Sequence, residues 1–381
     1  MRSTAYTTEH DAFREVVRDF LAKEVVPQFP EWERRGVVPR ELFVKAGALG
    51  IPGLQVPEEY GGGGSTSFKF NAVVTEEAAR AGVGIGGLSV HMNVVVPYFT
   101  SLCDADQRRR WLPGLAGGEL MSAIAMTEPG TGSDLAGMAT TATRDGDHYV
   151  LDGAKTFITG GINADLVIVV ARTGAGQDRR DGLSLLVVER GMDGFTRGRN
   201  LDKLGLKAQD TAELFFDSVR VPVANLLGEE GAAFRYLTGN LPQERLGIAV
   251  AAQAAAESAL RQTLDYVRER TVFGNPVSSF QNTKFELAGC EIEIEAGRAV
   301  LDKALDEHDA GTLSGADAAK VKVYCTELQS RVIDRCLQLH GGYGFMLEYP
   351  IARMYADARV TRIFGGTTEV LKTIVAKSLG L

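Results

Sequence analysis

Residues 121–130, with the sequence MSAIAMTEPG, mark the point at which the pattern of this chain changes. Before them, from about residue 11 to residue 118, apolar residues such as Phe13, Val16 and Phe20 recur at three- and four-residue steps, which is typical of helices. After them, short apolar runs are separated by Gly, Asp and Asn turns, which is typical of a mostly antiparallel β structure. Beyond Leu227 long amphipathic stretches return. The sequence therefore predicts an α+β chain with a helical part, a β part and a second helical part.

The same patterns place the individual elements. We expect strands at residues 122–126, 148–151, 156–159, 166–171, 183–189 and 212–217, and a hairpin turn at residues 144–147, RDGD. We expect long helices around residues 230–270, 282–309, 314–340 and 367–379. The expected domains are residues 1–120, 121–225 and 226–381. Because no low-complexity linker separates them, we expect the three domains to pack together.

The composition excludes several classes of protein. A formal net charge of −8, without a long run of one sign, argues against nucleic acid as a partner. No apolar run approaches the ~20 residues that cross a bilayer, and residues 1–10 are polar, so we expect a cytoplasmic protein without an integral membrane segment. The four cysteines, Cys103, Cys290, Cys325 and Cys336, lack zinc-ligand spacing. We therefore expect reduced core cysteines and no metal site.

Glu244 is a carboxylate in an apolar stripe. If its segment is helical, it shares one face with Leu241, Ile248, Ala252 and other apolar residues at three- and four-residue steps. A carboxylate held there is desolvated, so its pKa should rise toward the range in which it exchanges a proton near neutral pH. The alternative interpretation is that Pro242 opens a helix and Glu244 complements the dipole of its first turn.

Two stretches of the predicted β part are suited to binding a ligand. Residues 125–134, AMTEPGTGSD, join a strand to a loop that offers backbone N–H groups and short hydroxyls to a planar heteroaromatic ring or a phosphate. Residues 155–161, KTFITGG, end another strand with an aromatic side chain and a hydroxyl, which could line the same pocket. On pattern alone, residues 125–134 are equally interpretable as a plain connection between strands.

Two further glycine-rich stretches and an arginine corner lie in the second helical part. Residues 338–345 interrupt an apolar helix, and residues 363–369 open the last one, with Thr367 or Thr368 as a possible cap. Arg270, with Phe273, Gly274 and Gln281 nearby in the sequence, is either part of a surface ion pair or a pyrophosphate clamp. The simpler interpretation of all three is a helix–helix corner.

In this order the stretches resemble the acyl-CoA dehydrogenase family over essentially the whole chain. Residues 125–134 are similar to its first signature, and residues 338–369, including Asp357 and Arg359, are similar to its second; residues 201–211 and 241–246 look most like the long-chain type. The resemblance implies an N-terminal α-helical domain, a central β-barrel or sandwich domain and a C-terminal four-helix bundle. It also implies FAD in a homotetramer, and α,β-dehydrogenation of a fatty acyl-CoA in β-oxidation, with an electron-transferring flavoprotein as acceptor.

The resemblance also implies roles for individual residues. The flavin would contact Met126, Thr127, Gly132, Ser133, Phe157, Ile158 and Thr159. The diphosphate and adenosine part would contact Arg270, Phe273 and Gln281, together with Gln338, Gly341 and Gly342 of a neighbouring subunit, while Thr367 and Glu369 would close over the cofactor. The acyl thioester would contact Ser133, Arg245, Gly365 and Gly366, with the backbone N–H of Gly365 and a flavin ribityl hydroxyl on the thioester oxygen.

Gly365 departs from the pattern of many members, which place the catalytic glutamate there. The long-chain and isovaleryl types supply the base from the position of Glu244, the carboxylate that periodicity already selects. Because glycine is small, we expect Gly365→Glu to restore some activity to a Glu244→Gln variant. Phe157 replaces a tryptophan of many members, which leaves the flavin stacking open. Three alternatives also stay open: an acyl-carrier-protein-linked dehydrogenase, an oxygen-using oxidase or flavin monooxygenase, and a helical scaffold without a cofactor.

Overall fold

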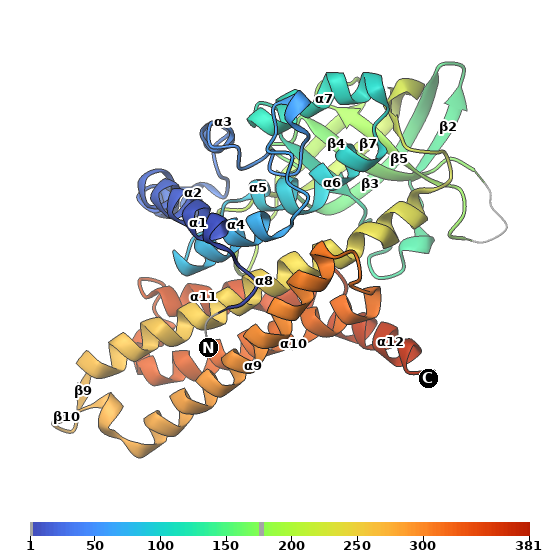
Figure 1. Ribbon diagram of the computed structural model, residues 1–381. Coiled ribbons are helices and arrows are strands. Elements are labelled where there is room, and N and C mark those ends of the chain that lie inside the picture. The colour runs from blue at the N-terminus through green and yellow to red at the C-terminus, as the bar shows by residue number, and fades with distance from the viewer. Residues whose placement is uncertain (1–2, 175–178) are drawn as a thin grey trace.

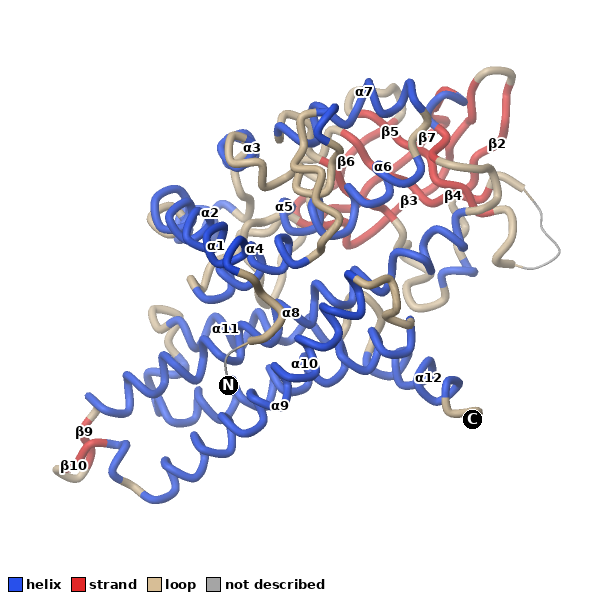
Figure 2. The backbone as a smooth tube through the Cα atoms, viewed as in Figure 1, coloured by secondary structure: helices blue, strands red, loops and turns tan. Residues whose placement is uncertain are grey.

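The change of pattern near Met121 becomes a change of architecture. The computed structural model describes residues 3–174 and 179–381. In Figure 1 the N-terminal helices and the strands lie side by side above a bundle of long helices, from yellow to red, that runs beneath both. Figure 2 shows that the strands gather in one region, apart from the small β9–β10 hairpin at the far tip of the bundle.

Short helices build the N-terminal part, because glycine and proline interrupt its apolar periodicity repeatedly. They are α1 Thr8–Phe20, α2 Phe29–Arg35, α3 Glu41–Gly47, α4 Lys69–Arg80, α5 Gly87–Val90, α6 Val96–Leu102 and α7 Ala105–Gly117, with π-helical turns η1 Leu21–Val25 and η3 His91–Val95. One cluster of buried residues, including Phe20, Trp32 and Phe43, forms the core of α1 to α5, whereas α6 and α7 pack against the sheet. Helix α4 packs against α8 of the bundle, so the N-terminal part rests directly on the helix that carries Glu244.

The β part is one sheet, in which strands β4 and β5 are buried on both faces. Its strands are β1 Ser122–Ala125, β2 Thr141–Asp145, β3 His148–Thr159, β4 Leu166–Arg172, β5 Leu183–Glu189, β6 Phe195–Asn200, β7 Thr211–Pro222 and β8 Leu226–Leu227. The order is β6-β7-β3-β2-β4-β5-β8, mostly antiparallel, with β1 parallel to β4. Alternate residues of β4 face two cores, Ile168 toward α6 and α7 and Val167 toward the other strands. This burial explains its continuous apolar run.

The predicted strands are present, with differences at β2, β3 and β6, and the two-residue strand β8 was not expected either. The expected strands at residues 148–151 and 156–159 are one strand, β3, which passes through a register shift at Gly153. Strands β2 and β6 were not expected, because most of their side chains are exposed or half-buried and show no apolar alternation. The expected turn at residues 144–147 joins β2 to β3, with Gly146 at φ +62°.

Long helices form the C-terminal bundle. They are α8 Ala233–Glu269, α9 Gln281–Asp309 and α10 Gly315–His340, followed by α11 Pro350–Ala358 and α12 Thr368–Ser378, with the hairpin β9 Thr271–Val272 and β10 Asn275–Pro276 between α8 and α9. Helix α10 contacts each of the other four. Helix α11 was not expected, since it is only nine residues long. Pro242 lies inside α8 rather than at its start, so the alternative that Pro242 opens a helix is wrong.

The four cysteines are buried in the packed cores, as expected. Within residues 3–174 and 179–381, no helix combines the length and the apolar character that crossing a membrane requires.

Candidate active site

Glu244 lies in the first third of α8 with only 7% of its surface exposed. Its Oε1 atom accepts a hydrogen bond from the Tyr98 hydroxyl of α6 at 3.1 Å. Asn240, one helical turn earlier, donates to the same oxygen at 3.3 Å. Both donors are neutral, and no lysine or arginine in the described part of the chain forms a salt bridge with this carboxylate. The geometry therefore leaves Glu244 buried, oriented and without a neutralising ion pair.

The environment of Glu244 raises its pKa to about 7. Burial is the dominant cause, because it disfavours the charged form. The hydrogen bonds from Tyr98 and Asn240 and the positive charge of Arg245 oppose the rise. At neutral pH the carboxylate is therefore near half ionisation, which suits a group that both takes and releases a proton.

The loop with Gly365 packs on the face of α8 that carries Glu244. A Cβ added to Gly365 would lie 2.4 Å from Cδ1 of Ile248, which is one turn after Glu244. Gly365 and Gly366 have φ angles of +64° and +96°. Thr367 caps the following helix α12, its hydroxyl accepting from the Val370 N–H at 3.3 Å. A side chain at Gly365 would therefore have to adopt this strained φ and displace the terminal methyl of Ile248, so the position is not open space, and the rescue of Glu244→Gln by Gly365→Glu stays a prediction.

Arg245 places a positive charge beside the loop of Gly365. It is buried, and its Nε has no hydrogen-bond partner among the described residues. Its Nη2 lies 4.0 Å from the position that a Cβ on Gly366 would take. Burial lowers the pKa of the guanidinium, and the charge of Glu244 opposes this. A buried guanidinium with an unsatisfied N–H is suited to an acceptor that is brought by a ligand.

The glycine-rich loop after β1 is held from below by a buried ion pair. Lys155 of β3 donates to Oε1 of Glu128 at 2.8 Å and to the Met126 carbonyl at 3.1 Å. Glu128 also accepts from the backbone N–H groups of Ala139 and Thr140 at 2.7 and 3.0 Å. Burial alone would raise the pKa of Glu128, but these hydrogen bonds lower it to about 2. The pair fixes a loop whose upper side, including Gly132 and Ser133, is exposed.

Phe157 is an aromatic side chain that the fold holds outward. It is 66% exposed and has a φ of +60°, a conformation that costs a residue with a side chain about 1–3 kcal/mol. The pairing of β3 with β7 shifts register between Lys155 and Ile158, and such a bulge turns a side chain away from its regular direction. Ile158, in contrast, is buried in the sheet core, so only its backbone can face a ligand. Thr159 is half-buried and accepts from Gln209.

A second group of candidate ligand-binding residues lies around the C-terminal end of α8. Arg270 sits over the Tyr343 ring at 5.4 Å and forms no salt bridge within the described part of the chain. It borders a cavity of about 400 Å³, a size typical of ligand sites. The cavity is lined by Tyr266, Arg270, Val272, Val277, Leu339, His340, Gly341, Gly342, Tyr343 and Met346. Phe273 and Gln281 are exposed on the adjacent hairpin and helix start, and Gln338 is exposed one turn before Gly341.

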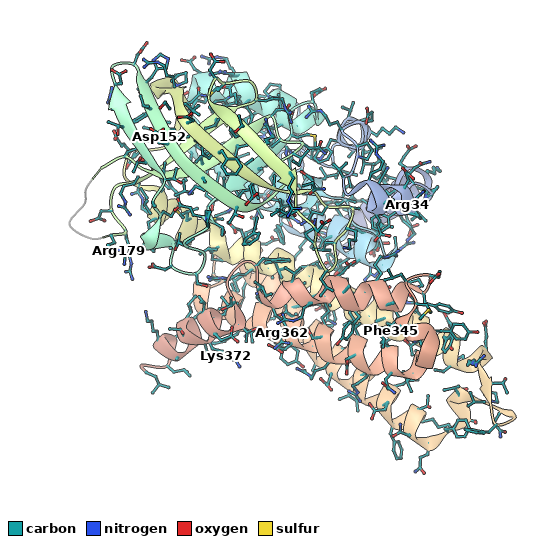
Figure 3. The ribbon with its side chains drawn as sticks, turned by 180° about the vertical axis from the view of Figure 1, so that it is seen from behind. Arg34, Asp152, Arg179, Phe345, Arg362 and Lys372 are labelled. Carbon is teal, nitrogen blue, oxygen red and sulfur yellow. The ribbon has the colours of Figure 1, made fainter. Side chains whose placement is uncertain are left out.

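The Glu244 site and the Arg270 cavity are far apart within one chain. Glu244 and Arg270 are separated by 26 residues along one helix, which corresponds to about 39 Å at 1.5 Å per residue. Figure 3 shows Arg362 and Lys372 at the end of the bundle below the β part, and Phe345 farther along toward the β9–β10 end. Arg270 and Gly341, which we assigned to different subunits, instead border the same cavity of one chain.

Several residues of the site were not assigned from the sequence. Tyr98 gave no signal, because its contact with Glu244 joins segments 146 residues apart. Asn240 could have been found, since a residue four positions before Glu244 lies on the same helical face. Glu128 and Lys155 lie inside stretches that were selected, but a buried ion pair between a loop and a strand cannot be deduced from either stretch alone.

Comparisons with known proteins give one family for all three parts. Residues 7–119, 123–219 and 231–380 match the N-terminal, middle and C-terminal domains of acyl-CoA dehydrogenase. The chain is 46% identical over 375 residues to the long-chain specific mitochondrial acyl-CoA dehydrogenase of Sus scrofa, covering 98% of this chain and 87% of that protein. The crystal structure of an acyl-CoA dehydrogenase from Geobacillus kaustophilus matches with a TM-score of 0.98 and 47% identity over 100% of both chains. An acyl-CoA dehydrogenase from Bacillus anthracis complexed with FAD matches with a TM-score of 0.90 and 31% identity, over 98% of this chain and 68% of that one.

Proposed function

This chain belongs to the acyl-CoA dehydrogenase family, and on that premise we propose that it oxidises a long-chain fatty acyl-CoA to the trans-2-enoyl-CoA with Glu244 as the base. The buried, hydrogen-bonded Glu244, with a pKa of about 7, is the observation that carries the proposal. The name of the pig relative supports the long-chain substrate class. We further propose that an electron-transferring flavoprotein accepts the electrons.

Glu244 removes the α-proton of the thioester in this proposal. The proton of an acyl thioester is weakly acidic, so the base needs a raised pKa and no water in competition. Burial supplies both conditions, and the donors Tyr98 and Asn240 hold Oε1 in place so that Oε2 is the oxygen available to the substrate.

The loop of Gly365 stabilises the charge that develops on the thioester oxygen. Its backbone N–H is a donor that needs no reorganisation, because Ile248 and the cap of α12 hold the loop. Arg245 adds a buried positive charge next to Gly366. A donor of this kind contributes about 3–4 kcal/mol of transition-state stabilisation in other enzymes.

The residues present fit FAD, which when bound would accept the hydride of the β-carbon. The exposed upper side of residues 126–133 offers backbone N–H groups, and space is open around Gly130. Phe157, held outward by the bulge, is suited to lie against a flat ring. Arg270, which forms no salt bridge with any described residue, and the open positions of Gly341 and Gly342 fit a diphosphate and its adenosine.

We also propose that each FAD is held by two copies of the chain, consistent with a homotetramer. The flavin must lie near Glu244, and about 39 Å along α8 is longer than an extended FAD. The Arg270 cavity therefore serves the FAD of a neighbouring copy. Sedimentation of the yellow protein should give a multiple of 40.9 kDa; a monomer that keeps its FAD would contradict this assembly.

The test of the function is anaerobic mixing of the purified protein with saturated acyl-CoAs of increasing chain length. We expect the flavin absorbance to bleach, with a trans-2-enoyl-CoA as product and the highest kcat/KM for long chains. A preference for an acyl carrier protein thioester would replace coenzyme A as the carrier of the proposed substrate. Peroxide formed in proportion to substrate when oxygen is admitted would replace the electron-transferring flavoprotein as the acceptor. A colourless protein that no acyl thioester affects would refute the function.

A further inference from the structure

Lys322 of α10 is a fully buried lysine that contacts the loop carrying Gly365. Its Nζ donates to the carbonyl oxygen of Gly366 at 2.8 Å. No carboxylate in the described part of the chain lies within salt-bridge distance of this ammonium group. Burial and the nearby charge of Arg245 lower its pKa to about 8, against the charges of Glu327 and Glu369. Burying a cation without a counter-ion costs several kcal/mol, so this lysine does not serve stability alone.

Helix α10 anchors both flanks of the same loop. Before it, Gln329 accepts a hydrogen bond from the Thr361 hydroxyl at 2.8 Å. Glu327 accepts from Nε of Arg362 at 3.0 Å and, after the loop, from the Thr368 hydroxyl at 3.1 Å. Between these anchors lie Gly365 and Gly366, the residue type with the greatest backbone freedom. Lys322 of α10 reaches this middle section through its hydrogen bond to the Gly366 carbonyl.

We propose that Lys322 is a positioning residue of the proposed dehydrogenation, which holds the Gly365–Gly366 pair so that the Gly365 N–H stays aimed at the thioester oxygen. The bond to the Gly366 carbonyl fixes one end of the glycine pair, and the N–H of Gly365 is at its other end. Together with Arg245, the ammonium also adds positive charge beside the position at which the enolate oxygen forms. The inference rests on the proposed function.

The test compares Lys322→Met with Lys320→Met. Methionine has a similar length and apolar volume but no donor, and Lys320 is exposed two residues earlier on the same helix, paired with Asp317 at 2.9 Å. A 3-oxoacyl-CoA provides a readout without turnover, since its α-carbon lies between two carbonyls and ionises to an absorbing enolate. We expect Lys322→Met to slow anaerobic flavin bleaching at least about tenfold at saturation, with half-saturation changed less than about twofold. The bound 3-oxoacyl-CoA should ionise about one pH unit higher than on the unaltered protein.

The proposal would be overturned if Lys322→Met, like Lys320→Met, bleached its flavin at the wild-type rate and ionised the bound 3-oxoacyl-CoA at the wild-type pH. A lower melting temperature with unchanged ligand ionisation in the folded protein would also overturn it, because this is the result of a purely structural lysine. If Lys322→Met does not fold, Lys322→Gln is used instead. The glutamine side chain is one bond shorter than lysine, so its amide does not reach the Gly366 carbonyl, and the bound 3-oxoacyl-CoA should again ionise at a higher pH. If no acyl-CoA bleaches the unaltered protein, it is the function that fails, whatever the variants show.

Discussion

Tyr98→Phe should move the pH dependence of the reaction without changing its chemistry. The variant removes the hydroxyl that donates to Oε1 of Glu244 at 3.1 Å and keeps the ring that packs in the core beside α7. A hydrogen bond to a charged group is worth about 1.5–3 kcal/mol, and 1.36 kcal/mol corresponds to one pH unit. The pKa of Glu244 should therefore rise from about 7 to roughly 8–9.

The sign of this change decides the assay. Glu244 acts as a base in its ionised form, so the rate rises with pH through its pKa, and a higher pKa moves that rise to higher pH. At pH 7 the ionised fraction should fall from about one half to between about a tenth and a hundredth, a loss of about 5- to 50-fold in kcat/KM. Near pH 9.5 most of the activity should return.

The measurement is kcat/KM for one acyl-CoA between pH 5.5 and 10, because this quantity reports the pKa of the free enzyme. Tyr324→Phe is the matched control, since its hydroxyl meets the Glu293 carbonyl in the bundle at 3.4 Å and should leave the rise at about 7. A Tyr98→Phe profile that still rises at about 7, or a loss that is equal at every pH, would refute the assignment of this hydrogen bond.

Two further variants test the support of the site. Gly365→Ala should lower the free energy of unfolding by about 1–2 kcal/mol and reduce kcat, because alanine resists the φ of +64° and its Cβ would clash with Ile248. Adding Ile248→Ala should relieve the clash but not the backbone strain. Full recovery in the double variant would therefore show that only the space matters. Lys155→Met should lower the free energy of unfolding in denaturant by about 3–5 kcal/mol and release FAD, because it leaves Glu128 buried without its ion-pair partner. A variant that unfolds like the wild type would show that the ion pair does not hold the loop.

The sequence was sufficient for the parts of the fold that burial makes periodic. The long helices and the apolar strands β4 and β5 carry one-sided or continuous apolar patterns, and these were predicted within a few residues. Strand β6 was missed because its exposed and half-buried residues show no apolar alternation, and β3 was divided because Asp152-Gly153 forms a bulge rather than a turn. Local pattern does not distinguish a bulge within a strand from the end of a strand.

The site was predictable only where its residues are adjacent in sequence or on one helical face. Glu244 was selected because one apolar stripe of α8 carries it. The contact of Gly365 with Ile248 and the reach of Lys322 to Gly366 join segments more than 40 residues apart, and no local pattern encodes them. The same limitation made Gly365 seem roomy, because glycine in sequence does not show whether its φ or its neighbours require it.

The rate of anaerobic flavin bleaching in Glu244→Gln tests the central claim most directly. Glutamine keeps the size of the side chain and removes the base, so the variant should be yellow and folded, and long-chain acyl-CoA should bleach its flavin about 10²–10⁴-fold more slowly than in the wild type. Glu269→Gln, at the exposed end of the same helix, should bleach at the wild-type rate. Bleaching of Glu244→Gln near the wild-type rate would contradict the account, because another group would then have to remove the proton.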